Sequence, residues 1–145
     1  MDGIELFLLG RTLMKLGEEA IPTDGVGTYT TSNRTVLIVA TDIRTHPGSS
    51  VGEIAERTGF PQSQVSGCIA RLREVGAIET EPDPHDRRRL LVRPASQVSE
   101  RVAEVRAARI EGPVAEALGT DDPEQVAEVV AALELLATRL RRSQP

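Results

Sequence analysis

The feature that most constrains the fold is a glycine-centred turn between two short helical patterns. Ser50 and Glu53 have the S-x-x-E spacing of a capping box, in which each side chain satisfies a free amide of the first helical turn. This spacing predicts a helix that begins at Val51 and ends at Gly59, because glycine adopts the left-handed conformation at low cost. Pro61 suits the first turn of another helix. The stretch therefore predicts a helix, a tight turn and a second helix.

The second helix is predicted over residues 61–75, with Val65, Ile69 and Leu72 on its inner face and Gly76 at its end. A helix-turn-helix needs a small residue where its helices approach, and Ala55 occupies that place. Short polar side chains near the start of the second helix can approach base edges and phosphates of DNA. The candidate contact residues on its outer side are Gln62, Ser63, Gln64, Ser66, Gly67 and Arg71.

A charged hairpin is predicted directly after this helix. The extended segments AIETEP and RRLLVRP flank the sequence PDPHDR, which supplies turn residues and charge. Such a cationic projection can enter a minor groove, where the negative potential attracts arginine. The candidate contacts are His85, Arg87, Arg88 and Arg89, and Asp86 is expected to hold an arginine side chain by a charge-assisted hydrogen bond.

The remaining sequence predicts further helices and little else. Apolar periodicity indicates helices over residues 4–21, from about Ser32 to the HPGSS stop, over 96–118 with a bend at Gly112 and Pro113, and from Asp122 to about 142. The Gly- and Thr-rich stretch after the first helix, with D-G-V-G-T at Asp24, lacks a phosphate-loop lysine and is predicted to be a loop. With 145 residues and 2% aromatics, we expect one helix-dominated folding unit.

The charge distribution permits a nucleic-acid partner despite a net charge of -5. Residues 51–94 carry seven basic and seven acidic side chains, and three of the basic ones are the consecutive Arg87, Arg88 and Arg89. The single cysteine, Cys68, excludes an intramolecular disulfide and a Cys-rich metal site. The sequence shows neither a signal peptide nor a long apolar run, so the cytoplasm is expected.

The stretch from Ser50 to Pro94 resembles the MarR family of winged-helix regulators. The resemblance is carried by VSGCIARLREVGAI and by the D-x-x-D-R-R-R-L-L-V segment from Asp83 to Val92. It implies a homodimer with an interface of N- and C-terminal helices, whose two winged domains bind a roughly palindromic site. It also implies repression relieved by small phenolic or other anionic ligands in some members, and by thiol oxidation in others. At Gly67 many members carry a long polar or basic side chain instead.

Together these observations predict a mainly α protein: a winged helix-turn-helix with a two-stranded β wing and N- and C-terminal dimerisation helices. We expect a single domain over residues 1–145, with a DNA-binding part at about 32–95 and dimerisation helices at about 1–22 and 96–145. The predicted function is a sequence-specific DNA-binding transcriptional regulator, a repressor acting as a homodimer. The partners are double-stranded DNA, a second copy and an unidentified small-molecule effector, with no cofactor and no membrane.

Several alternatives stay open from the sequence alone. The acidic balance and Gly67 also fit a winged helix that binds only protein. Arg71 can pair with a neighbouring side chain instead of a phosphate, and the arginines of the hairpin can simply be solvated. Cys68 is interpreted as a small core residue rather than a thiol sensor. His46 and His85 lack a second ligand at metal spacing, and no nucleophile and base at a recognisable spacing indicate an enzyme.

Overall fold

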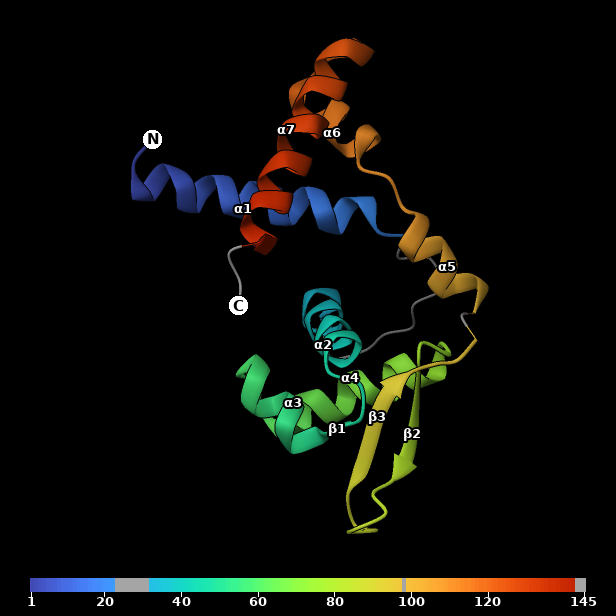
Figure 1. The fold of residues 1–145 in the computed structure, drawn as a ribbon. Helices are drawn as coiled ribbons and strands as arrows, with labels where there is room; N and C mark the ends of the chain where they lie inside the picture. The colour runs from blue at the N-terminus through green and yellow to red at the C-terminus, as the bar shows by residue number, and fades with distance from the viewer. Residues whose placement is uncertain (23–31, 98, 143–145) are drawn as a thin grey trace. The chain divides into compact units, whose positions relative to one another are not determined.

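A computed structural model of the chain describes residues 1–22, 32–97 and 99–142. Its contacts divide the chain into a central unit of residues 23–106 and a terminal unit of residues 1–22 and 107–145. The loop predicted after the first helix, with the Asp24 motif, falls on residues 23–31 and lies outside the described residues. The elements are α1 Gly3–Ala20, α2 Asn33–Thr45, β1 Ser49–Ser50, α3 Val51–Thr58, α4 Gln62–Glu74, β2 Ile78–Pro82, β3 Leu90–Pro94, α5 Glu100–Ala107, α6 Glu111–Leu118 and α7 Pro123–Arg142 (Figure 1).

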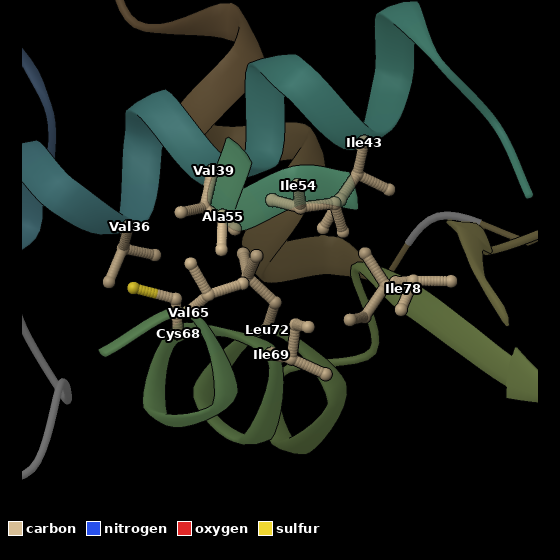
Figure 2. Close-up of a cluster of buried hydrophobic side chains, with 11 residues drawn as sticks. Val36, Val39, Ile43, Ile54, Ala55, Val65, Cys68, Ile69, Leu72 and Ile78 are labelled. Carbon is tan, nitrogen blue, oxygen red and sulfur yellow. The ribbon is translucent and has the colours of Figure 1, made fainter. Parts of the chain in front are cut away.

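Helices α2, α3 and α4 enclose the core of the central unit. Figure 2 shows their apolar side chains pointing toward one another, and Val39, Ile54 and Val65 are each 0% exposed. The inner face predicted for α4 is confirmed, because Val65, Ile69 and Leu72 are all buried. Burial of aliphatic side chains is the main favourable contribution to folding such a unit. The cluster contains Val36, Val39, Ile43, Ile54, Ala55, Val65, Cys68, Ile69, Leu72, Ile78 and Val92.

A three-stranded antiparallel sheet follows this core, with strand order β1-β3-β2. The hairpin predicted from the sequence is confirmed as β2 and β3, and Figure 1 shows it extending away from the helices of the central unit. The prediction of two strands was incomplete, because β1 pairs with β3 through Ser49 opposite Val92 and Ser50 opposite Leu91. Val92 is 0% exposed and fixes the inner face of β3 against the core.

The helix-turn-helix has the boundaries that its caps and glycines predict. The Ser50 side chain accepts a hydrogen bond from the Glu53 amide at 3.2 Å, and α3 ends at Gly59 with φ at 76°. Gly76 follows α4 with φ at 73°. The capping-box prediction was wrong in one half, because the Glu53 carboxylate accepts a hydrogen bond from the Ser50 hydroxyl at 3.0 Å and not from the Ser50 backbone amide.

One partly buried ion pair fixes α3 against α2. The guanidinium of Arg57 donates to both carboxylate oxygens of Asp42, from Nε at 3.0 Å and from Nη2 at 2.7 Å, and Nη2 also donates to Ser49 Oγ at 2.7 Å. The hydrogen bond that Arg57 donates to Asp42 raises the pKa of Arg57. His46 Nδ1 lies 3.6 Å from the same carboxylate. A bidentate arginine fixes orientation as well as distance, so α3 is held at a defined angle to α2 and β1.

The terminal unit contains α1, α6 and α7, and much of its apolar surface is exposed. Val114 of α6 and Val126 of α7 are buried, whereas none of the 18 residues of α1, all of them described, is buried. Phe7 is 68% exposed and Ile4 72%. An apolar groove of about 280 Å³ lies between the three helices. No helix in the described part of the chain is long and apolar enough to cross a membrane.

The helix predicted over residues 96–118 is two helices, α5 and α6, and the break is not where the sequence indicated. Residues 108–110 separate them, whereas Gly112 and Pro113 lie in the first turn of α6. The amides of a first helical turn have no acceptor within the helix, so Pro113 removes no hydrogen bond there. Nearly all of α5 belongs to the central unit, so the terminal unit begins again near residue 107 rather than at 96.

Candidate nucleic-acid interface

The outer side of α4 carries small and polar side chains that are open to solvent. Because Val65, Cys68, Ile69 and Leu72 point inward, helical periodicity turns the residues between them outward. The predicted contacts Gln62, Ser63, Ser66 and Gly67 are all exposed, together with Ala70 further along the same side. Such short side chains allow the backbone of the helix to approach a partner closely. The hydroxyl groups and the amide supply hydrogen-bond donors and acceptors at the N-terminal end of the helix.

Two residues predicted to face DNA point toward α2 instead. Arg71 is only 8% exposed, and its Nη2 donates to Asn33 Oδ1 at 2.5 Å. Gln64 is half-buried, and its amide nitrogen donates to Thr35 Oγ1 at 3.4 Å. Both side chains lie on the flank of α4 that packs beside α2. The structure therefore corrects the assignment of Arg71, which acts within the fold, and removes Gln64 from the outer surface.

Arg73 is an exposed basic residue on α4 that the sequence analysis did not select. It forms no ion pair with any residue of the described ranges. Helical spacing with Val65, Ile69 and Leu72 inward places residues 71 and 73 on opposite flanks of α4. The sequence therefore indicates that one of these two arginines can be covered while the other stays exposed. Only contacts with α2 decide which flank is covered. Arg73 therefore replaces Arg71 as the cation that α4 offers to a partner.

The tip of the β2–β3 hairpin is held in shape by its two aspartates and carries exposed cations. Asp83 Oδ1 accepts from the His85 amide at 2.8 Å, and Asp86 Oδ1 accepts from the Arg88 amide at 3.1 Å. His85, Arg87 and Arg88 are exposed, and within the described residues neither arginine forms an ion pair. Asp86 thus supports the tip through the backbone, and not by holding an arginine side chain as expected. Asx turns of this kind order a loop locally.

Arg89 differs from the two arginines that precede it. Its Nη2 lies 2.7 Å from Glu53 Oε1, at the start of α3. Its backbone carbonyl accepts from the Asp83 amide at 2.9 Å, and its own amide donates to the Asp86 carbonyl at 2.9 Å. Arg89 therefore closes the hairpin loop and joins the loop end of the hairpin to α3. Of the three consecutive arginines, Arg87 and Arg88 form no ion pair within the described residues, whereas Arg89 is paired with Glu53.

These contacts bring the hairpin and the start of α4 to the same edge of the central unit. The Arg89–Glu53 pair places the loop end of the hairpin beside the N-terminal end of α3. A Cβ on Gly52, the preceding residue, would lie 3.6 Å from Gln62 Nε2, so the first residue of α4 meets the same end of α3. The exposed start of α4 and the cationic hairpin are therefore neighbours, and both are available to one elongated partner such as a duplex.

The described residues offer no metal centre and no accessible thiol. No group of three His, Cys, Asp or Glu residues within them could hold a metal ion. Cys68 is 0% exposed between α2 and α4. Desolvation raises the pKa of its thiol, which keeps it protonated and unreactive. The interpretation of Cys68 as a core residue is confirmed by this burial.

The fold and this edge define a class of protein, the winged helix-turn-helix proteins. Helix α4 occupies the position of the recognition helix, and the β2–β3 hairpin is the wing. Residues 35–89 match the model of the MarR family. By that match and by its fold, the central unit is similar to the MarR family of winged-helix transcriptional regulators.

Several solved structures share the fold across most of the chain. PcaV from Streptomyces coelicolor, in complex with its natural ligand, is 19% identical and has a TM-score of 0.52, covering 90% of this chain and 89% of its own. FabT from Streptococcus pneumoniae, in complex with DNA, is 16% identical with a TM-score of 0.50 and covers 96% of both chains. The apo form of MarR from E. coli is 16% identical with a TM-score of 0.55, covering 89% of this chain and 93% of its own. No curated protein matches the sequence.

Proposed function

We propose that the chain is a cytoplasmic repressor that binds a roughly palindromic DNA operator as a homodimer. In each copy, Gln62, Ser63 and Ser66 at the start of α4 contact base edges in the major groove. Gly67 lets the helix backbone approach the duplex. Most of the affinity comes from the wing arginines and from Arg73, through phosphates and the minor groove.

The main support for the proposed DNA-binding surface comes from two exposed arginines at the tip of the wing. Arg87 and Arg88 are exposed and form no ion pair within the described residues, in a chain whose net charge is -5. Their carboxylate neighbours Asp83 and Asp86 are engaged with backbone amides. Cations held apart from acidic partners on an acidic protein indicate a polyanionic ligand. FabT, which has the same fold, was solved in complex with DNA.

The proposed homodimer is supported by the exposed apolar side chains of the terminal unit. Ile4, Leu6 and Phe7 of α1 are more than half exposed, as are Leu135 and Leu140 of α7. Large apolar side chains exposed together on the helices of one unit favour an interaction site there. A two-fold symmetric pair of winged helices matches a roughly palindromic operator, because each copy meets one half-site.

The proposed surface is tested by removing the wing cations and measuring DNA affinity against salt. We expect Arg87→Ala and Arg88→Ala each to weaken binding to a duplex selected from a random pool. Each should lower the slope of log affinity against log salt by about two for the dimer, because one fewer phosphate is neutralised in each of the two copies. The measurement is fluorescence polarisation between about 50 and 200 mM salt.

Arg109→Ala is the matched control, since it removes the same charge from the terminal unit, where Arg109 pairs with Glu111. An unchanged slope in both wing variants would exclude the wing from the DNA contact. Failure of the wild-type chain to select any duplex would favour the alternative, a winged helix that binds only protein.

The proposal also includes a small-molecule effector that releases DNA, as the family resemblance implies and as the ligand in PcaV supports. Repeating the assay with phenolic acids tests that part.

A further inference from the structure

We propose that Glu53 and Arg89 are a pair of positioning residues that set the direction of the wing relative to α3 and α4. This inference rests on the proposed DNA contact of the wing. Arg89 Nη2 lies 2.7 Å from Glu53 Oε1, and the same oxygen accepts from the Ser50 hydroxyl at 3.0 Å. The ion pair is the side-chain connection between the loop of the wing and the first turn of α3. It is charge-assisted and short, which restricts its geometry.

Glu53 departs from the usual role of the acidic residue in a capping box. In a complete capping box, the acidic side chain three residues after the cap bonds the backbone amide of the cap residue. That arrangement exists in α1, where Asp2 and Glu5 bond each other's amides. In α3 the Glu53 carboxylate leaves the Ser50 amide and meets Arg89 instead. The start of α3 thus lacks one of the two hydrogen bonds of a capping box, and its acidic residue pairs with Arg89 of the wing instead.

Arg89 lies where the loop of the wing meets strand β3. Its carbonyl and amide close the loop through Asp83 and Asp86, and β3 begins at the next residue. Ser50 and Leu91 pair across β1 and β3, so the backbone is already fixed two residues beyond Arg89. A side-chain bond at Arg89 extends this attachment to the point where the tip begins. The direction of Arg87 and Arg88 then depends on Glu53.

The exposure of the Glu53–Arg89 pair and its internal pairing favour a positioning role over a role in stability or in direct DNA contact. The side chains of Arg89 and Glu53 are 47% and 49% exposed, and exposed ion pairs contribute little to folding stability. An Arg89 guanidinium engaged with Glu53 has less charge to offer a phosphate. Pairing also neutralises a carboxylate that would otherwise repel DNA at this edge. The pair is therefore expected to act on the wing and not on the fold.

The first experiment measures the mobility of the wing without DNA. A nitroxide is attached to a cysteine introduced by His85→Cys, and the native Cys68 stays in place because it is 0% exposed. We expect Glu53→Gln and Arg89→Gln each to make the label more mobile, and the double variant to match either single one. Glu56→Gln is the control, because it removes the same charge from an exposed position on the same helix. Unchanged mobility in both variants would overturn the proposal, whether or not the chain binds DNA.

The second experiment uses the sign of the effect on DNA affinity, measured on the selected duplex with a native His85. Glu53→Gln removes a negative charge near the duplex, so a purely repulsive role predicts tighter binding. The positioning role predicts binding weaker by about two- to fivefold, with Arg89→Gln the same and the double variant no worse. The salt slope should stay unchanged in Arg89→Gln, in contrast to Arg88→Ala. Tighter binding of Glu53→Gln, or a slope lower by about two in Arg89→Gln, would contradict the assignment.

The exchanged variant, Glu53→Arg with Arg89→Glu, completes the test. If the two residues act only through each other, this variant regains label immobility and most of the affinity that the single variants lose. If Arg89 contacts a phosphate itself, the exchange places a carboxylate at that contact and binding is lost. Thermal unfolding of all variants, expected within a few degrees of the wild type, separates positioning from loss of fold.

Discussion

Cys68 shows how the surroundings of one side chain decide what chemistry it can perform. It lies on α4 one residue before Ile69, and its sulfur is enclosed by side chains of α2 and α4 (Figure 2). Thiol sensors need an accessible group with a lowered pKa, whereas desolvation raises the pKa of this thiol. Of the two modes of release that the family resemblance implied, thiol oxidation therefore finds no support at this residue.

The raised pKa of Cys68 leads to a prediction about stability at alkaline pH. The folded chain holds the thiol proton more tightly than the unfolded chain, whose thiol ionises near its ordinary pKa of about 8.5. Stability from this group is present below that pH and declines above it. We expect the difference in unfolding free energy between wild type and Cys68→Ala to shrink from about pH 8 to about pH 10. Denaturant titration measures it, and rapid labelling of the native thiol would contradict the burial.

At the scale of elements, the helix-turn-helix depends on the left-handed conformation of Gly59. Its φ of 76° lies where a side chain is strained, although no atom within 4 Å would meet its Cβ. We expect Gly59→Ala to lower the unfolding free energy by about 1 kcal/mol or more through backbone strain alone. Thermal unfolding measures this, and Gly112→Ala is the control because Gly112 lies in a helix with open space around it. Equal stability of the two variants would show that the turn tolerates a side chain.

The elements also show which features a sequence can predict. Caps, glycines and apolar spacing are local signals, so α2, α3, α4 and the wing were predicted within a residue or two. The two-residue strand β1 has no pattern of its own and exists only because β3 offers it a partner. The choice between Arg71 and Arg73 likewise depends on Asn33, 38 residues from Arg71 along the chain. Contacts between distant segments decide such cases, and no local pattern records them.

At the scale of the whole molecule, the terminal unit leaves its largest apolar side chains without cover. Phe7 and Leu135 are 68% and 60% exposed, and they belong to the two longest helices, α1 and α7. The winged-helix part was predictable because its core is complete within one chain. Contacts within the terminal unit leave many of its apolar side chains exposed. The single domain expected over residues 1–145 stays a prediction.

The proposed dimer gives a test at this scale. We expect Phe7→Glu or Leu135→Glu to raise the dimer dissociation constant at least about tenfold, because a carboxylate must then be buried against apolar side chains. Thr12→Glu is the control, since it introduces the same charge at an exposed polar position of α1. Sedimentation velocity over a concentration series measures the change. A wild-type chain that sediments as a monomer at every concentration would refute the dimer.

The uncovered face of α1 has a consequence for dosage in the cell. If two copies must meet before either can occupy an operator, then at concentrations where single copies predominate the bound fraction grows with the square of the amount of protein. Halving expression would then reduce occupancy about fourfold, by the same mass-action relation. A gene under such a regulator would respond to small changes in regulator abundance more sharply than a one-copy binder allows.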